Sequence, residues 1–300
     1  MTHDENDHEL DRKMPNDPSR REFVALSAAV GLVAAAGSAS TAELRVVEQD
    51  VEVKTPDGTC DAAFIHPAAG SHAGVLLWPD AFGLRPATRD FGERLAAEGY
   101  SVLVPNPFYR SAKAPMTADV STFDFKNEAD MAKMRAWMSP LNEPGAAERD
   151  AQSYIAFLDA QRQVNKAKKI GTQGYCAGGP LVLKTAAQVP DRVGAGASFH
   201  GGGLVTDKPD SPHLLAPKIK ARTYFAIAAN DDTRQPDAKD KLREAFAAAK
   251  VPAEIEVYPG TLHGWCVPDM PLQNGNPMYS KPDAERAWSK LVALYRTALA

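Results

Sequence analysis

A cysteine between two glycines lies where an apolar segment passes into a helical one. The sequence GYCAG occupies Gly174–Gly178, after the apolar run Lys169–Tyr175 and before the helical pattern Gly179–Gln188. A nucleophile on so sharp a turn leaves no room for side chains two residues to either side, which explains the glycines. The N-terminus of the following helix favours a thiolate. The pattern predicts Cys176 as a nucleophile; the other interpretation is a buried cysteine in a glycine-rich turn.

Two later segments carry a pair of carboxylates and a histidine. Asp231 and Asp232 follow the apolar run Arg222–Ala228, and His263 follows Ala253–Tyr258. In nucleophilic hydrolysis an imidazole moves the proton and a carboxylate orients the imidazole. Where the nucleophile lies on such a turn between a strand and a helix, the acid and then the histidine follow it in the sequence. Asp231 is predicted as the acid because it lies closest to the end of the run, and His263 as the base. Asp232 remains the alternative acid.

The other histidines and cysteines of the body are weaker candidates. His213 lies in a proline-bounded loop, and His200 starts a run with three glycines that we interpret as a wall of the site or a structural turn. Three cysteines are too few for a disulfide framework, and no Cys-x-x-Cys pair suggests structural zinc. The sequence leaves open whether Cys60 and Cys266 pair with each other. No metal is predicted.

Alternating strands and helices must position these groups. Such alternation over the body of the chain predicts an α/β fold, with a mainly parallel sheet of about eight strands and helices on both faces. The predicted strands are Val46–Lys54, Cys60–His66, Ala73–Trp78, Tyr100–Pro105, Lys169–Tyr175, Gly194–His200, Arg222–Ala228 and Ala253–Tyr258. The predicted helices are Arg85–Glu98, Glu128–Met138, Pro144–Gln161, Gly179–Gln188, Gln235–Lys250 and Asp283–Leu299.

Composition excludes several classes of protein. A chain of 300 residues that is 44% hydrophobic can bury a large core, which excludes disordered proteins and disulfide-stapled miniproteins. The 34 basic residues against 38 acidic ones provide no basic field for nucleic acid. Beyond the N-terminal segment, no apolar run is long enough to span a membrane. The expected partner is therefore a small molecule.

The first 42 residues differ from the body of the chain. After a polar, acidic stretch, Arg20 and Arg21 precede the apolar run Ala25–Ala36 and a group of small residues. This order resembles the twin-arginine export signal of bacteria. We predict an export signal with a polar extension over residues 1–42, a catalytic domain over residues 43–300, and delivery to the periplasm by the twin-arginine machinery. The alternative is a buried alanine-rich helix behind a disordered tail, in a cytoplasmic protein.

Four segments resemble the dienelactone hydrolase family, a branch of the α/β-hydrolases with a cysteine nucleophile. They are Pro79–Leu84, Gly174–Gly179, Ala229–Asp232 and Tyr258–Trp265, and Arg286–Trp288 resembles the family's final helix. The resemblance implies the α/β-hydrolase fold and hydrolysis of lactones or carboxylic esters. It also implies a Cys-Asp-His triad with a thioester intermediate, and no metal or organic cofactor.

The resemblance implies roles for further residues. The backbone N–H groups of Ala81 and Ala177 would hold the oxyanion. Asp80 stands where the family has a glutamate that holds the resting thiol, and Arg110 where a substrate arginine falls. No arginine follows His263 closely, where a second one is usual. The residues predicted to contact substrate are Asp80, Phe82, Arg110 and Trp265, the two aromatic side chains as walls of an apolar pocket.

Two functions from other classes remain open. One is a non-catalytic binding protein on the same frame, against which the complete order of cysteine, acid and histidine argues. The other is a periplasmic thiol redox protein. That function lacks a resolving cysteine close in sequence to Cys176, although Cys266 follows His263 by three residues.

We expect the paired arginines to be necessary for export, because the twin-arginine pathway reads both guanidinium groups. Replacing both, Arg20→Lys with Arg21→Lys, should leave the protein in the cytoplasm, as measured by cell fractionation and immunoblotting. Periplasmic delivery that survives the double substitution would contradict the predicted signal.

Overall fold

The computed structural model describes residues 44–300. The predicted export signal, residues 1–42, lies outside the described residues. Within residues 44–300, no helix is both long enough and apolar enough to cross a membrane.

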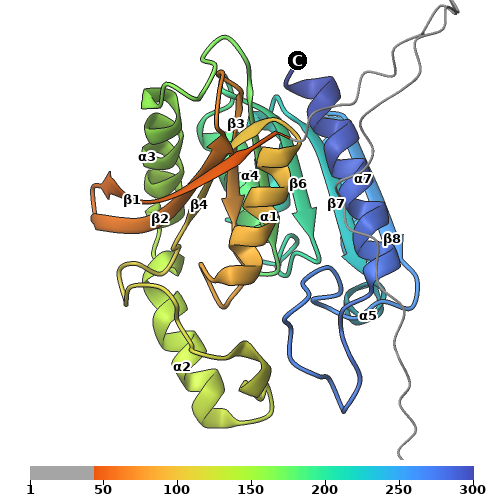
Figure 1. Ribbon diagram of the computed structural model, residues 1–300. Helices are drawn as coiled ribbons and strands as arrows, with labels where there is room; N and C mark the ends of the chain where they lie inside the picture. The colour runs from red at the N-terminus through yellow and green to blue at the C-terminus, as the bar shows by residue number, and fades with distance from the viewer. Residues whose placement is uncertain (1–43) are drawn as a thin grey trace, which may run out of the picture. The chain divides into compact units, whose positions relative to one another are not determined.

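An eight-stranded sheet forms the centre of the described part of the chain (Figure 1). Its strand order is β1-β2-β4-β3-β5-β6-β7-β8. The hairpin β1–β2 is antiparallel, β2 pairs with β4 in the antiparallel direction, and every other neighbouring pair is parallel. The strands are β1 Val46–Thr55, β2 Gly58–Pro67, β3 Ala73–Trp78, β4 Tyr100–Pro105, β5 Ile170–Tyr175, β6 Val193–Phe199, β7 Arg222–Ala228 and β8 Ala253–Tyr258.

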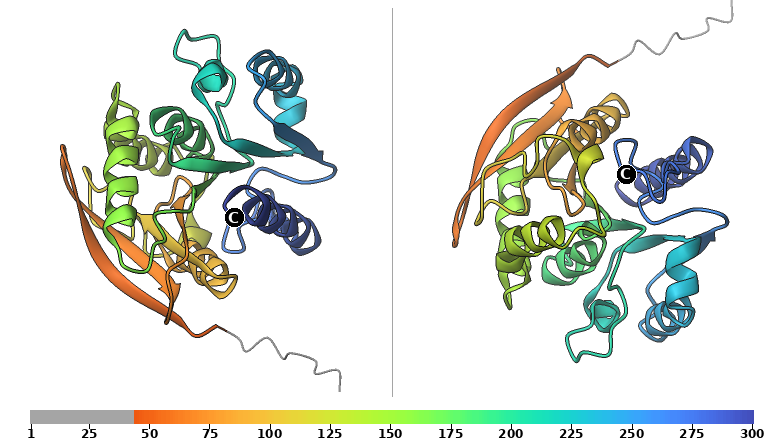
Figure 2. Two further views of the ribbon diagram at one scale, coloured as in Figure 1. Left: turned by 90° about the horizontal axis from the view of Figure 1, so that it is seen from above. Right: turned by 90° about the horizontal axis from the view of Figure 1, so that it is seen from below.

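Helices cover both faces of the sheet (Figure 2). Helices α1 and α7 pack on one face, and α3, α4 and α6 on the other. The helices are α1 Pro86–Ala97, α2 Glu128–Met138, α3 Ala146–Ala160, α4 Gly178–Gln188, α5 Ala229–Arg234, α6 Ala238–Ala248 and α7 Lys281–Ala298. Short 3₁₀ segments are η1 Val120–Thr122, η2 Ser139–Asn142 and η3 Pro212–Lys218.

The central strands are buried on both faces, as the apolar run of β3 predicts. Every residue of β3, β4 and β5 is buried. Strands without a solvent face tend to be continuous apolar runs rather than alternating ones, and β3 is such a run, whereas β5 also buries Thr172 and Gln173. The predicted α/β fold with a mainly parallel sheet is therefore confirmed.

The sequence analysis did not predict the short helix α5, to which Asp231 and Asp232 belong. Both carboxylates lie in the first turn of α5, where a negative charge is stabilised by the unpaired N–H groups of a helix.

The parallel strands bring distant parts of the sequence to one edge of the sheet. Residues Trp78 and Gly174 are paired across β3 and β5, and Ala228 is paired with Tyr258 across β7 and β8. The segments that follow these strands therefore leave the sheet at the same edge, where ligands bind in open α/β sheets. The segment between β4 and α2 and the segment between β8 and α7 both extend beyond this edge (Figure 1).

An aromatic stack supports the sheet directly beneath this edge. The ring of Tyr175 lies between those of Phe91 on α1 and Phe199 on β6, with centroid distances of 4.7 and 5.0 Å and interplanar angles of 16°. Tyr175 is the last residue of β5, so the stack holds the backbone from which Cys176 departs.

Candidate active site

The turn at Cys176 is strained and tightly packed. Cys176 has a φ of 51°, a left-handed conformation that costs energy for a residue with a Cβ. A Cβ on Gly174 would lie 2.1 Å from the carbonyl oxygen of Gly178, and one on Gly178 would lie 2.6 Å from that of Trp78. The glycines are therefore required by close approach of the backbone, as the sequence predicted.

A chain of hydrogen bonds joins the three predicted catalytic side chains. His263 Nε2 lies 3.0 Å from Cys176 Sγ, and His263 Nδ1 lies 2.6 Å from Asp231 Oδ2. The three residues come from the turn after β5, from α5 and from the segment after β8. Hydrolases with a nucleophile, a base and an orienting acid connect these groups in the same order.

The two neighbouring aspartates have different partners. Asp232 Oδ1 accepts a hydrogen bond from Lys239 Nζ at 2.7 Å, and only Asp231 contacts the imidazole. The other oxygen of Asp231 lies 3.4 Å from Arg234 Nη1. Of the two acids that the sequence left open, Asp231 is thus the one at the histidine.

Asn230 is a positioning residue that the sequence analysis did not single out. Its Oδ1 accepts a hydrogen bond from the backbone N–H of His263 at 2.9 Å. The bond ties the segment after β8 to the beginning of α5, so the imidazole and its carboxylate keep a fixed separation. The position of Asn230 next to Asp231 in the sequence is the one feature that could have indicated this role.

Charge favours a protonated His263. Burial lowers the pKa of His263, but the negative charge at Cys176 and the hydrogen bond to Asp231 outweigh it and raise the pKa to about 10. The carboxylate of Asp231 behind the ring therefore favours the protonated imidazole.

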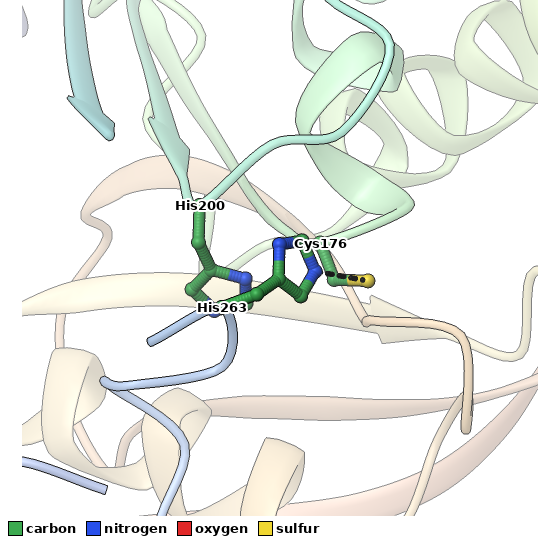
Figure 3. A group of neighbouring side chains, drawn as sticks. All are labelled: Cys176, His200 and His263. Carbon is green, nitrogen blue, oxygen red and sulfur yellow. Dashed lines mark hydrogen bonds between the residues drawn. The ribbon is translucent and has the colours of Figure 1, made fainter. Parts of the chain in front are cut away.

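His200 packs against the same imidazole (Figure 3). The two rings meet edge to face with centroids 4.9 Å apart, and His200 has a φ of 39°. Burial, followed by the charge of His263, holds the pKa of His200 well below its ordinary value. Within residues 44–300, Cys176, His200 and His263 are the group whose spacing could hold a metal ion, their ligand atoms lying within 4.8 Å of one another. An ion there would take up the thiolate and imidazole of the hydrogen-bonded pair.

The predicted oxyanion donors lie in the two segments that follow β5 and β3. Ala177 follows Cys176 at the start of α4, and Ala81 follows β3. Within the described residues, neither backbone N–H is engaged by a protein acceptor. The carbonyl of Ala81 accepts a hydrogen bond from Trp137 Nε1 at 2.9 Å, which fixes the orientation of that segment.

Asp80 is bound by an arginine that the sequence analysis did not identify. Arg85 donates to Asp80 through Nη1 and Nη2, at 2.8 and 2.9 Å, and to Asp269 through Nε and the same Nη2, both at 2.8 Å. Asp80 Oδ1 also accepts from the N–H of Phe82 at 2.9 Å. Since Arg85 and Asp80 are both buried, each compensates the other's charge. In the structure Asp80 therefore pairs with Arg85 and makes no hydrogen bond with the thiol.

Arg110 lies in a separate cluster of charges. Its guanidinium makes two hydrogen bonds of 2.7 Å to the buried Asp150 and also pairs with Asp57. Tyr109 donates to Asp150 at 2.9 Å. The structure thus commits Arg110 to holding the β1–β2 turn against α3, and it does not line the pocket at His263. Its part in binding substrate stays a prediction.

The two predicted aromatic walls are buried in the fold. Trp265 is fully buried and stacks on Tyr258 with centroids 4.4 Å apart. Phe82 is also buried, and its ring meets that of Phe123 edge to face at 5.1 Å. Phe82 therefore supports a wall of the site from behind, whereas Trp265 belongs to the core under α7.

A cavity of about 500 Å³ opens over His263. Its lining comes mainly from the segment after η1 and from the segment between β8 and α7. Predominantly apolar walls with a few polar groups are typical of small-molecule sites. The lining residues are Phe123, Asp124, Phe125, Lys126, Arg234, His263, Met270, Leu272, Gln273, Asn274 and Met278.

Comparison with known proteins decides the family. The model of the dienelactone hydrolase family matches residues 60–299. The chain belongs to the dienelactone hydrolase family. It is accordingly a dienelactone hydrolase-like hydrolase, as the four sequence segments predicted.

Individual relatives agree with this dienelactone hydrolase-like fold. The carboxymethylenebutenolidase of Rhodococcus opacus is 27% identical over 215 residues, covering 71% of this chain and 78% of the relative. The dienelactone hydrolase of Anabaena variabilis has a TM-score of 0.58 at 18% identity, covering 85% of this chain and 99% of that one. A dienelactone hydrolase-like promiscuous phosphotriesterase from metagenomic libraries has a TM-score of 0.66 at 20% identity, with the same coverage. These structures show the α/β-hydrolase fold.

The cysteines of this family member are all free in the structure. Cys60 is buried and accepts a hydrogen bond from Tyr154 at 3.2 Å, and Cys266 is buried as well. Burial raises the pKa of the Cys60 thiol to about 12 and that of Cys266 well above its ordinary value. Both are therefore neutral thiols, and Cys176 is the one cysteine of the three that is partly exposed.

We expect Gly174→Ala to destabilise the protein by more than about 3 kcal/mol, because the new Cβ would collide with a backbone carbonyl that cannot rotate away. Gly202→Ala is the matched control: it lies in the neighbouring loop with nothing within 4 Å of an added Cβ. That substitution should change the free energy of unfolding by less than about 1 kcal/mol. Urea denaturation measures both, and equal effects would contradict the packing argument.

Proposed function

We propose that the chain is a cysteine-dependent hydrolase of lactones or carboxylic esters that works through an acyl-enzyme. The observation that carries the proposal is the hydrogen-bonded chain from Asp231 through His263 to Cys176, built on a strained turn. Membership of the dienelactone hydrolase family and the name of the Rhodococcus opacus relative support this substrate class.

The first half of the proposed reaction acylates the cysteine. The thiolate of Cys176 attacks the carbonyl carbon, and the electrons of the carbonyl bond move to its oxygen. The N–H groups of Ala81 and Ala177 stabilise that oxyanion. The imidazolium of His263 gives its proton to the leaving oxygen as the bond between carbon and that oxygen breaks, which leaves a thioester and a free alcohol.

The second half releases the acid. His263, now neutral, removes a proton from a water molecule, and the hydroxide attacks the thioester carbon. The same two N–H groups hold the second oxyanion. When it collapses, the carbon–sulfur bond breaks, the carboxylic acid departs and the thiolate again faces an imidazolium. Asp231 orients the ring in both halves and stabilises its charged form.

We expect Cys176→Ala to lower kcat for hydrolysis by about 10⁶-fold, because the covalent route loses its attacking atom. Cys176→Ser should also be poor, since a hydroxyl is far less ionised than a thiol. Spectrophotometric hydrolysis of 4-nitrophenyl acetate measures the effect. Cys60→Ala is the control, because that thiol is buried away from the imidazole, and it should keep activity. Near-normal turnover by Cys176→Ala would refute the proposed function.

We expect Asp231→Asn to lower kcat by about 10³- to 10⁴-fold, because an amide neither fixes the imidazole's tautomer nor stabilises its positive charge. Asp232→Asn is the matched control. It breaks only the pair with Lys239 and should change kcat less than about threefold. A reversed order of severity would identify Asp232 as the acid.

A further inference from the structure

The cavity over His263 is walled by two segments that are far apart in the sequence. One wall is Phe123 and Phe125, which follow η1, and the other is Met270, Leu272 and Met278, between β8 and α7. The two segments are joined across the cavity, because Lys126 Nζ donates to Asn274 Oδ1 at 2.8 Å. The bond keeps the walls at a fixed spacing.

The walls of the cavity carry partly exposed apolar side chains. Phe125 is 45% exposed and Leu272 is 62% exposed, although both are large hydrophobic residues. Phe123 and Phe125 meet edge to face at 5.1 Å, and Phe82 supports both rings from behind. Covering such exposed apolar side chains with a ligand removes their surface from water, which favours binding.

Apart from His263, the charged residues that line the cavity have partners within the protein. Lys126 is held by Asn274, and Arg234, which is largely exposed, lies beside Asp231. Asp124 accepts a hydrogen bond from the backbone N–H of Lys126 at 2.8 Å. The rest of the lining is mainly apolar, and it suits an uncharged group.

The cavity adjoins the base and not the nucleophile. His263 is among its lining residues, whereas Cys176, Ala81 and Ala177 are not. The atom that receives the proton from His263 during acylation is the leaving oxygen, so the alcohol portion of an ester must lie on the imidazole side of the carbonyl carbon. The acyl portion lies on another side of that carbon.

We propose that this cavity binds the leaving alcohol, and that the preferred substrates are esters of apolar alcohols. The inference rests on the proposed function, since it assigns one part of the ester to one part of the same site. Binding there places the leaving oxygen next to His263. Each buried methylene of the alcohol should raise kcat/KM about threefold until the cavity is filled.

Two series of esters test the proposal on the whole protein. Ethyl, butyl and hexyl acetate lengthen the alcohol, and ethyl butyrate and ethyl hexanoate lengthen the acyl group by the same number of carbons. All three acetates form the same acetyl-enzyme, so differences in kcat/KM among them report the acylation step alone. Base uptake at constant pH measures every reaction. We expect kcat/KM to rise about tenfold from ethyl to butyl acetate and to change less than threefold along the acyl series.

A double variant tests the walls directly. Phe125→Ser with Leu272→Ser should lower kcat/KM about tenfold more for hexyl acetate than for ethyl acetate, whose shorter alcohol covers less of the walls. Both side chains are partly exposed and lie outside the helices and strands, so the double variant should keep the fold. Leu214→Ser is the matched control, a similarly exposed leucine on η3 outside the cavity, and should change neither substrate.

The other possible results of these two experiments contradict either the inference alone or the proposed function as well. Acetates that are hydrolysed without dependence on alcohol length, or a rise along the acyl series instead, overturn the inference and leave the proposed function intact. Equal losses on both acetates in the double variant also overturn it. Turnover of none of the five esters overturns the proposed function and the inference with it.

Discussion

The close approach of the backbone around Cys176 is the constraint on which the site depends. The left-handed conformation of Cys176 directs its thiol away from the sheet, and it is tolerated because Gly174 and Gly178 let the turn pack against the end of β3. The hydrogen bond from the N–H of Cys176 to the carbonyl of Phe199 ties this turn to β6. The strain is thus balanced by packing against the ends of β3 and β6 rather than by any single bond.

Buried charge pairs hold the segments that surround this turn. Arg85 joins Asp80, just after β3, to Asp269, just after the histidine segment, so the oxyanion side and the imidazole side are linked through one guanidinium. Arg110 and Asp150 do the same between the β4 segment and α3. Removing one partner would leave a buried charge uncompensated, which costs far more than the pair itself contributes. Such pairs fix geometry more than they add stability.

The cavity and the hydrogen-bonded side chains share one segment of the chain. His263 lies at the beginning of the segment between β8 and α7, and Met270, Leu272 and Met278 of the same segment line the cavity. The opposite wall comes from the segment after η1, which is joined to the first through Lys126 and Asn274. Under the proposed function, the choice of ester therefore depends on residues that follow the base along the same segment.

The sequence by itself determined the sheet, the nucleophile turn, the histidine and the family, because apolar periodicity and the glycine spacing are local properties of the chain. Only the tertiary structure decided which aspartate meets His263, since Asp231 and Asp232 are neighbours in the chain and His263 lies 32 positions away, on the segment after β8. The structure also showed that Arg85 binds Asp80 and that Arg110 is bound to Asp150. Ion pairs between residues 40 to 184 positions apart leave no periodic signal, so their partners emerge only when the sheet brings them together.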